Sequence, residues 1–184
     1  MSGFEGGYIQ ARDFSFCPWC RAALSEKEFD GRKRRYCPDC GFIWYKNPVP
    51  AAGAIIHENG RLLLVRRKYP PKKGDWGLPA GFQEFDESPE ECCVREVKEE
   101  TGLDIRIEAP FWNYRAGDDP RTTVVLILYL GARIDGDLKP GDDATEAAYF
   151  DLSEIPSNIA FSAHREAIAH FREFIERGTL PSRD

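Results

Sequence analysis

The sequence has no long apolar run and no excess of positive charge. No apolar stretch reaches the roughly 20 residues that cross a bilayer, and the first residues, MSGFEGGYIQARDF, lack the apolar core of a signal peptide. The formal net charge of −6 argues against nucleic-acid binding through bulk electrostatics. We therefore expect a cytoplasmic protein whose partners are neither membranes nor nucleic acids.

The chain also lacks internal repeats and low-complexity segments. Its 184 residues suffice to bury one core and to carry one small additional module. The apolar fraction of 42% and the charged fraction of 30% are those of an ordinary globular protein. Six cysteines are present, and four of them lie in two Cys-x-x-Cys pairs, a pattern that favours metal binding over a disulfide scaffold.

The two cysteine pairs are Cys17-Pro-Trp-Cys20 and Cys37-Pro-Asp-Cys40, with sixteen residues between them. This spacing is typical of a tetrahedral Zn²⁺ site with four thiolate ligands. Such a closed site leaves no open position, so we expect structural Zn²⁺; a redox dithiol is the alternative for either pair taken alone. Between the pairs lies the basic run Arg32–Arg35, which we interpret as a solvated hairpin turn rather than a contact to phosphate or RNA.

The distribution of motifs predicts four segments along the chain. Residues 1–16 carry no periodic pattern and form an N-terminal arm. Residues 17–45 form the zinc ribbon, and residues 46–50, KNPVP, form a stiff linker because two prolines stop regular pairing. Residues 51–184 form the second domain.

The second domain combines strands with two helices. Asn59-Gly60 between two apolar runs predicts a β-hairpin, and its second strand, LLLV at 62–65, is apolar enough to be buried on both faces. Further strands are predicted over residues 105–114, 122–134 and 146–151, and an amphipathic helix over residues 162–177. The fold class that follows is α+β.

The first helix of this domain has clear boundaries. Ser88 is a typical N-cap, Pro89 suits the first turn, and Gly102 suits the C-terminal end. Cys92 and Cys93 fall within this helix without any partner spacing, so we interpret them as packed core thiols.

Three glutamates of that helix point into a common space. Glu96, Glu99 and Glu100 have the spacing i, i+3, i+4, which puts them on one side of a helix. Their mutual repulsion would be relieved by a hard divalent cation, and Mg²⁺ or Mn²⁺ prefers such oxygen ligands. The alternative is an ordinary solvated acidic helix face.

A longer pattern surrounds these glutamates, with fixed positions at Gly81, Glu87, Arg95, Glu96, Val97, Glu99, Glu100, Gly102 and Leu103. This stretch fits every fixed position of the Nudix box, and the chain thus resembles the Nudix hydrolases, which hydrolyse a nucleoside diphosphate linked to another group X. The resemblance implies an α/β/α sandwich around a mixed sheet, here preceded by the small zinc-ribbon module.

The resemblance also implies roles for individual residues. Glu96, Glu99 and Glu100 would hold the divalent ion and activate water, and the carbonyl of Ala80 would add a ligand. Glu87 and Arg95 would form a pair that orients the helix against the preceding loop. Outside the box, Glu146 is our candidate for the general base; an ordinary carboxylate at a strand edge is the alternative.

Candidate substrate-binding residues lie outside the box. A predicted strand ends in Arg66, Arg67 and Lys68, where positive charge suits a diphosphate, although a surface role is the alternative for at least one of these three. Arg66 and Arg67 are the candidates for substrate binding. An adenine would stack on an aromatic ring, and Trp112 and Phe161 are the leading candidates. The further aromatic candidates are Phe82, Phe85 and Tyr114.

A zinc ribbon before a Nudix domain is similar to the NADH pyrophosphatases, but their Ser-Gln-Pro-Trp element is absent from residues 109–118. The chain resembles more closely the zinc-ribbon proteins related to plant ADP-ribose/FAD pyrophosphatases. The shared motifs are FCPWC at 16–20, YKNP at 45–48, WGLPAG at 76–81, EIP at 154–156 and AFS at 160–162.

This closer resemblance implies hydrolysis of a small nucleotide, ADP-ribose or FAD, with release of AMP, and a homodimer as the assembly. The alternatives are an NADH or NAD-capped RNA pyrophosphatase and a nucleotide-sensing regulator that binds nucleic acid through Arg32–Arg35. Such regulators usually have a broken box, whereas the box of this chain is intact.

Overall fold

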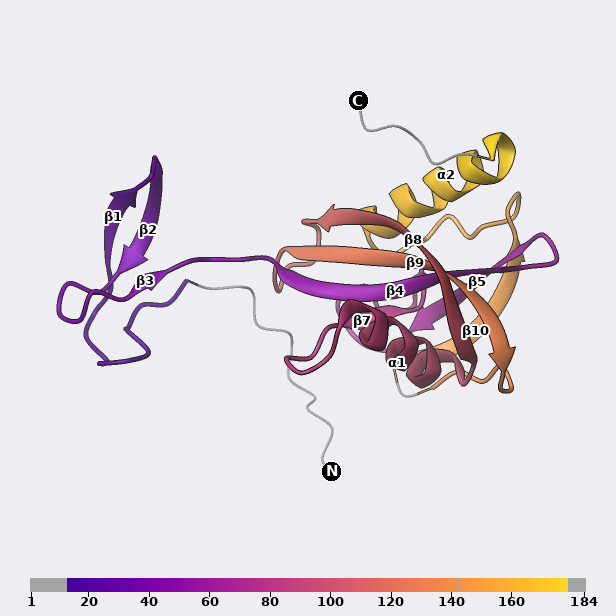
Figure 1. Ribbon diagram of the computed structural model, residues 1–184, viewed down its shortest axis with the longest axis horizontal. Helices are drawn as coiled ribbons and strands as arrows, with labels where there is room; N and C mark the ends of the chain where they lie inside the picture. Colours follow the sequence, from indigo (N-terminus) through magenta and orange to yellow (C-terminus); the bar gives the residue numbers. More distant parts are fainter. Residues whose placement is uncertain (1–12, 142, 179–184) are drawn as a thin grey trace.

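The computed structural model describes residues 13–141 and 143–178. Most of the predicted N-terminal arm, residues 1–16, therefore lies outside the described part of the chain. The described residues form a small sheet that carries the cysteines and a larger body built on a second sheet (Figure 1). An extended segment joins the two, with the small sheet standing away from the body.

The small sheet is antiparallel and contains β1 (Ser25–Phe29), β2 (Arg32–Tyr36) and β3 (Ile43–Trp44). The basic run predicted as a hairpin turn is instead part of strand β2, so that prediction is wrong. The turn falls on Asp30 and Gly31, which both have positive φ, at 50° and 72°. Those two residues take up this conformation more readily than arginine or lysine does.

The larger sheet contains seven strands in the described part of the chain, and they are β4 (Val49–Glu58), β5 (Arg61–Arg67), β6 (Trp76–Gly77), β7 (Ala80–Phe82), β8 (Asp104–Ala116), β9 (Val124–Asp135) and β10 (Ala144–Asp151). Its order is β10-β5-β4-β9-β8, with β6 paired to β5 and β7 paired to β4. The β4–β9 pair is parallel and the other pairs are antiparallel. The sheet is therefore mixed, as predicted.

Strand β4 begins earlier than the prolines led us to expect. Val49 and Pro50, placed in the predicted linker, pair with Val124 and Val125 of β9. The carbonyl of Pro50 accepts a hydrogen bond from the backbone N–H of Gln83 at 3.1 Å. Proline lacks only the backbone N–H donor, so its carbonyl can still accept a hydrogen bond from a neighbouring strand or loop.

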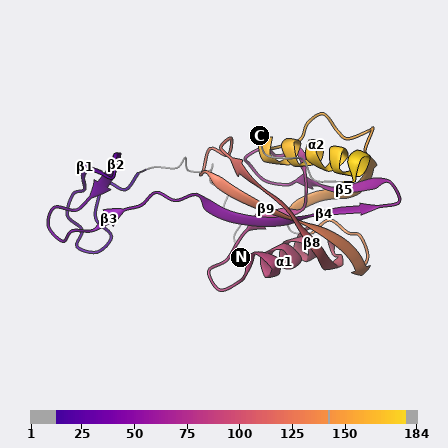
Figure 2. The same ribbon diagram turned by 45° about the horizontal axis from the view of Figure 1, so that its top comes forward.

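Two helices cover opposite faces of this sheet (Figure 2): α1 (Pro89–Thr101) and α2 (Ser162–Arg177). One core cluster packs Cys92, Cys93 and Val97 of α1 against one face, and another packs α2 against the other face. Strand β5 contributes side chains to both core clusters, because Leu63 faces α1 while Leu62 and Leu64 face α2. The predicted α/β/α sandwich, the doubly buried strand and the two core thiols are all confirmed.

Helix α1 begins and ends where the sequence predicts. Ser88 is the N-cap, and its hydroxyl and the Glu91 carboxylate form a reciprocal capping box. Gly102 ends the helix with φ of 73°, in the left-handed region that favours glycine. Among the described residues, no helix is both long and apolar enough to span a bilayer.

Candidate active site

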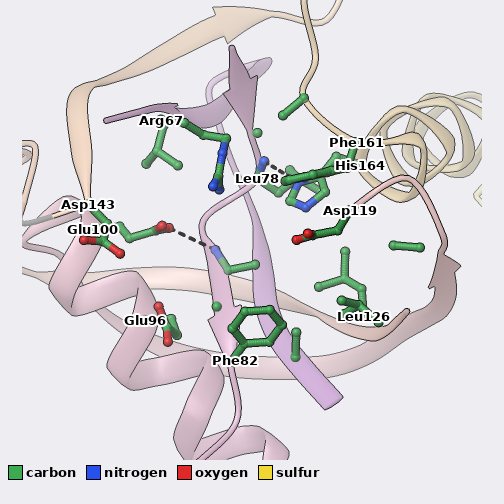
Figure 3. A pocket seen from close by; sticks show the side chains of 18 of the residues that line it. Arg67, Leu78, Phe82, Glu96, Glu100, Asp119, Leu126, Asp143, Phe161 and His164 are labelled. Carbon is green, nitrogen blue, oxygen red and sulfur yellow. Dashed lines mark hydrogen bonds between the residues drawn. The ribbon is translucent and has the colours of Figure 1, made fainter. Parts of the chain in front are cut away.

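A cavity of about 320 Å³ lies where α1, the end of β5 and the start of α2 approach β7. Figure 3 shows Glu96, Glu100 and Asp143 on one side of it, and Asp119, Phe161 and His164 on the other. Arg67 extends between the two groups. The cavity thus has an acidic side, and an opposite side that combines an aromatic ring, an imidazole and a carboxylate.

The acidic side is built by α1 and the strand before it. Glu96 and Glu100 both line the cavity, and Gly81 of β7 lines it next to the carboxylate of Glu96. A Cβ atom added to Gly81 would lie 2.2 Å from the Glu96 carboxylate, so a larger residue here would displace that carboxylate from its position. Glu99, the third predicted glutamate, is exposed and does not line the cavity; its carboxylate accepts from Arg95 at 3.0 Å.

Arg95 joins α1 to the loop that precedes it. Its guanidinium donates to both carboxylate oxygens of Glu87, at 2.9 and 2.6 Å, and to the Phe82 carbonyl at 3.0 Å. A further bond reaches Glu96 at 2.7 Å. The hydrogen bonds from Arg95 lower the pKa of Glu87 to about 2. The predicted Arg95–Glu87 pair is therefore present and fixes the position of Glu96.

The acidic side has too little positive charge to balance its carboxylates, of which Glu96 and Glu100 are largely buried. Burial and the neighbouring Glu96 raise the pKa of Glu100 to about 8, although the Ala80 N–H donates to Glu100 at 3.0 Å. Burial also raises the pKa of Glu96, against the opposing effect of Arg95. Asp143 lines the cavity and adds to the repulsion at both glutamates. A hard divalent cation is the group that such a donor set fits.

On the opposite side of the cavity, Asp119 and Arg121 form an ion pair that the sequence patterns did not predict. The Asp119 carboxylate is buried and receives bonds from the Arg121 side chain at 2.7 and 3.0 Å. Burial would raise the pKa of Asp119, but these bonds outweigh that effect and lower it. Arg121 also lies over the Phe82 ring, 5.4 Å from its centroid. Both residues follow β8, between the strands predicted over residues 105–114 and 122–134.

His164 lines the cavity from the first turn of α2. The Leu78 N–H donates to its Nδ1 at 2.9 Å, so in the neutral ring the proton lies on Nε2 (Figure 3). Burial, with a contribution from the charge of Arg67, lowers the pKa of His164 to about 4. The ring is therefore neutral at pH 7 and offers a donor that carries no charge.

Of the predicted substrate-binding residues, Arg67, Phe161 and the further aromatic candidate Phe82 line the cavity, whereas Phe85 and Tyr114 do not. The guanidinium carbon of Arg67 lies 5.1 Å from the Phe161 ring centroid. Burial and the nearby Arg121 lower the pKa of Arg67. Tyr69, two residues after Arg67, lines the cavity as well.

Arg66, Glu146 and Trp112 do not line the cavity. Arg66 donates to the Glu146 carboxylate at 2.6 Å across the β5–β10 pair, where both side chains are partly exposed. Successive residues of a strand point to opposite faces, so Arg67 enters the cavity and Arg66 does not. Trp112 packs edge-on against His170 of α2, with ring centroids 6.4 Å apart.

The four predicted zinc ligands meet in two turns beside the small sheet, one before β1 and one between β2 and β3. The sulfur atoms of Cys17, Cys20, Cys37 and Cys40 all lie within 4.8 Å of one another, with pairs at 3.4 and 3.6 Å. A tetrahedron with Zn–S bonds of about 2.3 Å has edges of roughly 3.8 Å, so the thiols fit Zn²⁺. Each pair closes a similar turn, in which the N–H four residues after the first cysteine donates to that cysteine's carbonyl.

The comparisons with known proteins agree on one family. The family model for the NUDIX domain matches residues 47–171. The chain is 42% identical over 128 residues to the ADP-ribose pyrophosphatase of Methanocaldococcus jannaschii, a match covering 69% of this chain and 75% of that protein. It is 30% identical over 146 residues to the NAD-capped RNA hydrolase NudC of Vibrio atlanticus, where it covers 77% of this chain but spans only 51% of the relative.

A solved structure extends the similarity beyond the matched domain. The crystal structure of a NUDIX hydrolase from Nitrosomonas europaea aligns with a TM-score of 0.80 at 28% identity. The alignment covers 92% of this chain and 97% of that one. The family match, the archaeal relative and the shared fold together show that the chain belongs to the Nudix hydrolase family.

Proposed function

We propose that the protein is a pyrophosphatase dependent on Mg²⁺ or Mn²⁺ that hydrolyses the diphosphate of ADP-ribose and releases AMP. One observation carries the proposal: the carboxylates of Glu96 and Glu100 on α1 line a cavity whose opposite side holds Phe161 and His164, with Arg67 extending between the two sides. Cation ligands on one side suit a diphosphate, and an aromatic ring beside a guanidinium suits the nucleoside attached to it.

The ligands we propose for the divalent ion are Glu96, Glu99, Glu100 and the carbonyl of Ala80. When bound, the ion would neutralise the diphosphate and lower the pKa of a water molecule for attack. Glu87 and Arg95 would act as positioning residues, because they fix the helix that carries these ligands. Glu99 can join the set by turning away from Arg95, since its side chain is exposed and holds a single ion pair.

For the general base we propose Asp143 in place of Glu146. Asp143 lines the cavity and influences the protonation of both Glu96 and Glu100. Glu146 is engaged by Arg66 at 2.6 Å and would have to break that ion pair to reach the cavity. A base must lie within hydrogen-bond reach of the water it deprotonates, which favours the carboxylate already at the cavity.

The choice of ADP-ribose rests on the archaeal relative, whose name gives that substrate, and on the motif resemblance to ADP-ribose/FAD pyrophosphatases. FAD is the nearest alternative substrate for a pyrophosphatase of this kind. A second candidate is NADH or NAD-capped RNA, because relatives named NAD-capped RNA hydrolase also match the chain. The missing Ser-Gln-Pro-Trp element argues against that second candidate.

A substrate panel tests the proposal. ADP-ribose, FAD, NADH and an NAD-capped oligonucleotide are incubated with the protein and Mg²⁺ or Mn²⁺, and AMP is quantified by chromatography. We expect ADP-ribose to give the highest kcat/KM and chelation to stop the reaction. Preference for NADH or the capped RNA would reject the substrate assignment, and cleavage of none would reject the pyrophosphatase itself. Glu100→Gln is the control for contaminating activity.

We further propose that Zn²⁺ bound by the four cysteines has a structural role. The small sheet has a core of only three buried residues, Cys17, Leu24 and Cys37, with two partly buried neighbours. So little buried surface does not hold a sheet together without a metal. The homodimer implied by the family resemblance stays a prediction, which light scattering of the purified protein tests.

A further inference from the structure

The two faces of the β1–β2 hairpin carry different sets of charged residues. Residues directly opposite each other in an antiparallel pair share a face, and successive pairs alternate between faces. Lys27 lies opposite Arg34, and Phe29 lies opposite Arg32. Glu26 and Glu28 lie opposite Arg35 and Lys33, on the other face.

One face is therefore cationic and aromatic, and we call it the cationic face. It consists of Lys27, Phe29, Arg32, Arg34, Tyr36 and Tyr45. No carboxylate from either strand lies on it, and Lys27, Arg32 and Arg34 form no ion pair with any described residue. Each glutamate of the hairpin faces a basic residue on the other side of the sheet, where Arg35 approaches Glu26 at 3.9 Å.

The cations and rings of the cationic face alternate at contact distance. Lys27 lies 5.6 Å from the Phe29 ring centroid and 5.7 Å from that of Tyr36. Arg34 lies over the exposed Tyr45 ring, 4.5 Å from its centroid. The two rings Phe29 and Tyr36 are themselves edge-to-face at 6.0 Å. Positive charges and aromatic rings thus lie side by side on this face.

We propose that the cationic face binds single-stranded nucleic acid without sequence preference. Alternating cations and aromatic rings are what a single strand requires, since its backbone carries one phosphate per exposed base. A duplex hides its base faces and would use only the charges. The site lies on the zinc ribbon, outside the catalytic cavity, and does not depend on which diphosphate the cavity hydrolyses.

The overall acidity of the chain does not oppose this site. The net charge of −6 is an average over the whole sequence, whereas fields from exposed charges are screened within about 10 Å at 0.1 M salt. An acidic protein segment would satisfy the same cations but would leave the rings without stacking partners. The rings therefore favour a nucleic-acid strand over such a protein.

The test uses the full chain and a fluorescent single-stranded RNA of mixed sequence, about twelve nucleotides long. Binding is followed by anisotropy between about 50 and 200 mM salt. Two matched double variants each remove two positive charges from β2: Arg32→Ala with Arg34→Ala on the cationic face, and Lys33→Ala with Arg35→Ala on the other. Zinc content and ADP-ribose hydrolysis are measured on both as controls for folding.

We expect the cationic-face variant to bind about 20-fold more weakly at 0.1 M salt and to lower the salt slope by about 1.4, as the loss of two phosphate contacts requires. The matched variant should change affinity less than about threefold. Tyr45→Ala should weaken binding about tenfold while leaving the slope unchanged, because stacking is not electrostatic. Hydrolysis should be equal in all variants.

Any of four results would contradict the proposed site. Two concern specificity: an RNA duplex that binds as tightly as the single strand, or polyglutamate that competes with the labelled RNA as effectively as unlabelled RNA does. The other two are an equal loss of RNA affinity in the two double variants, and no binding of RNA by the wild type at 50 mM salt. Each is read from anisotropy alone. Failure here is therefore distinct from failure of the proposed pyrophosphatase, which the AMP assay reports.

Discussion

Arg95 donates two hydrogen bonds to the Glu87 carboxylate, from Nε at 2.9 Å and from Nη2 at 2.6 Å. The same guanidinium reaches the Phe82 carbonyl and the Glu96 carboxylate. One planar side chain thus connects the loop, the strand before it and the acidic face of α1. A lysine carries the same charge but cannot make this set of directed bonds.

We therefore expect Arg95→Lys to lower kcat/KM by about 10- to 100-fold, because Glu96 loses its orientation. The fold should remain, since α1 keeps its capping box and its buried residues. The measurement is ADP-ribose hydrolysis across a Mg²⁺ titration, which should also move to higher Mg²⁺. Lys98→Arg, a change on the exposed side of the same helix, serves as the control. Wild-type turnover in Arg95→Lys would exclude the positioning role.

Glu100→Gln should abolish metal-dependent hydrolysis and change how stability depends on pH. Glu100 has its pKa raised from 4.5 to about 8, so its stabilising contribution is complete below pH 4.5 and is lost as the pH rises through 8. In the chelated wild type we expect Tm to fall on the order of 5 °C between pH 6.5 and 8.5.

The glutamine cannot ionise, so the Tm of Glu100→Gln should be nearly flat over the same range. Added Mg²⁺ should restore the wild type at pH 8.5 and should barely affect the variant. Differential scanning fluorimetry with and without chelator measures both quantities. A variant that keeps full activity would remove the metal assignment from this helix.

Asp143→Asn and Glu146→Gln separate the two candidates for the general base. We expect Asp143→Asn to lower kcat by about 10²- to 10⁴-fold, the usual contribution of a positioned base, while Glu146→Gln changes it less than about fivefold. Stopped assays at saturating ADP-ribose give both values. The reverse order would return the role to Glu146 and would require its ion pair with Arg66 to open during turnover.

His164→Asn should make the protein less sensitive to acid. Because the pKa of His164 is lowered from 6.5 to about 4, its contribution is present above pH 6.5 and is lost as the pH falls toward 4. At pH 5 the wild type should have lost about 2 kcal/mol through this residue. Asparagine can accept the Leu78 N–H without titrating. Urea unfolding at pH 7 and 5 in Mg²⁺ tests this, and equal acid losses in both proteins would contradict it.

Features that depend on neighbours in sequence were predictable. Ser88 and Gly102 set the ends of α1 through their own backbone and capping preferences, and Asn59-Gly60 sets the hairpin, with φ of 52° and 81°. The spacing of the cysteines also anticipated that their sulfurs meet. Local conformational preference determines such features before the chain is packed.

Features that depend on tertiary packing were not predictable. Asp119 and His164 reach the same cavity from the end of β8 and the start of α2, and no spacing connects two residues so far apart. Arg66 and Arg67 are adjacent, and only the register of β5 decides which of them enters the cavity. The charge sorting between the faces of the β1–β2 hairpin likewise follows from register alone.

Strand β4 starts at Val49, directly after the segment that leaves the ribbon, and pairs in parallel with β9 from Val49 to Ile56. It also pairs with β7, where Ala52 lies opposite Gly81. A pull on the ribbon along β4 would strain these hydrogen bonds together instead of one after another, so the attachment resists mechanical tension. Any such tension would act on the strand that pairs with Gly81, the residue next to the carboxylate of Glu96.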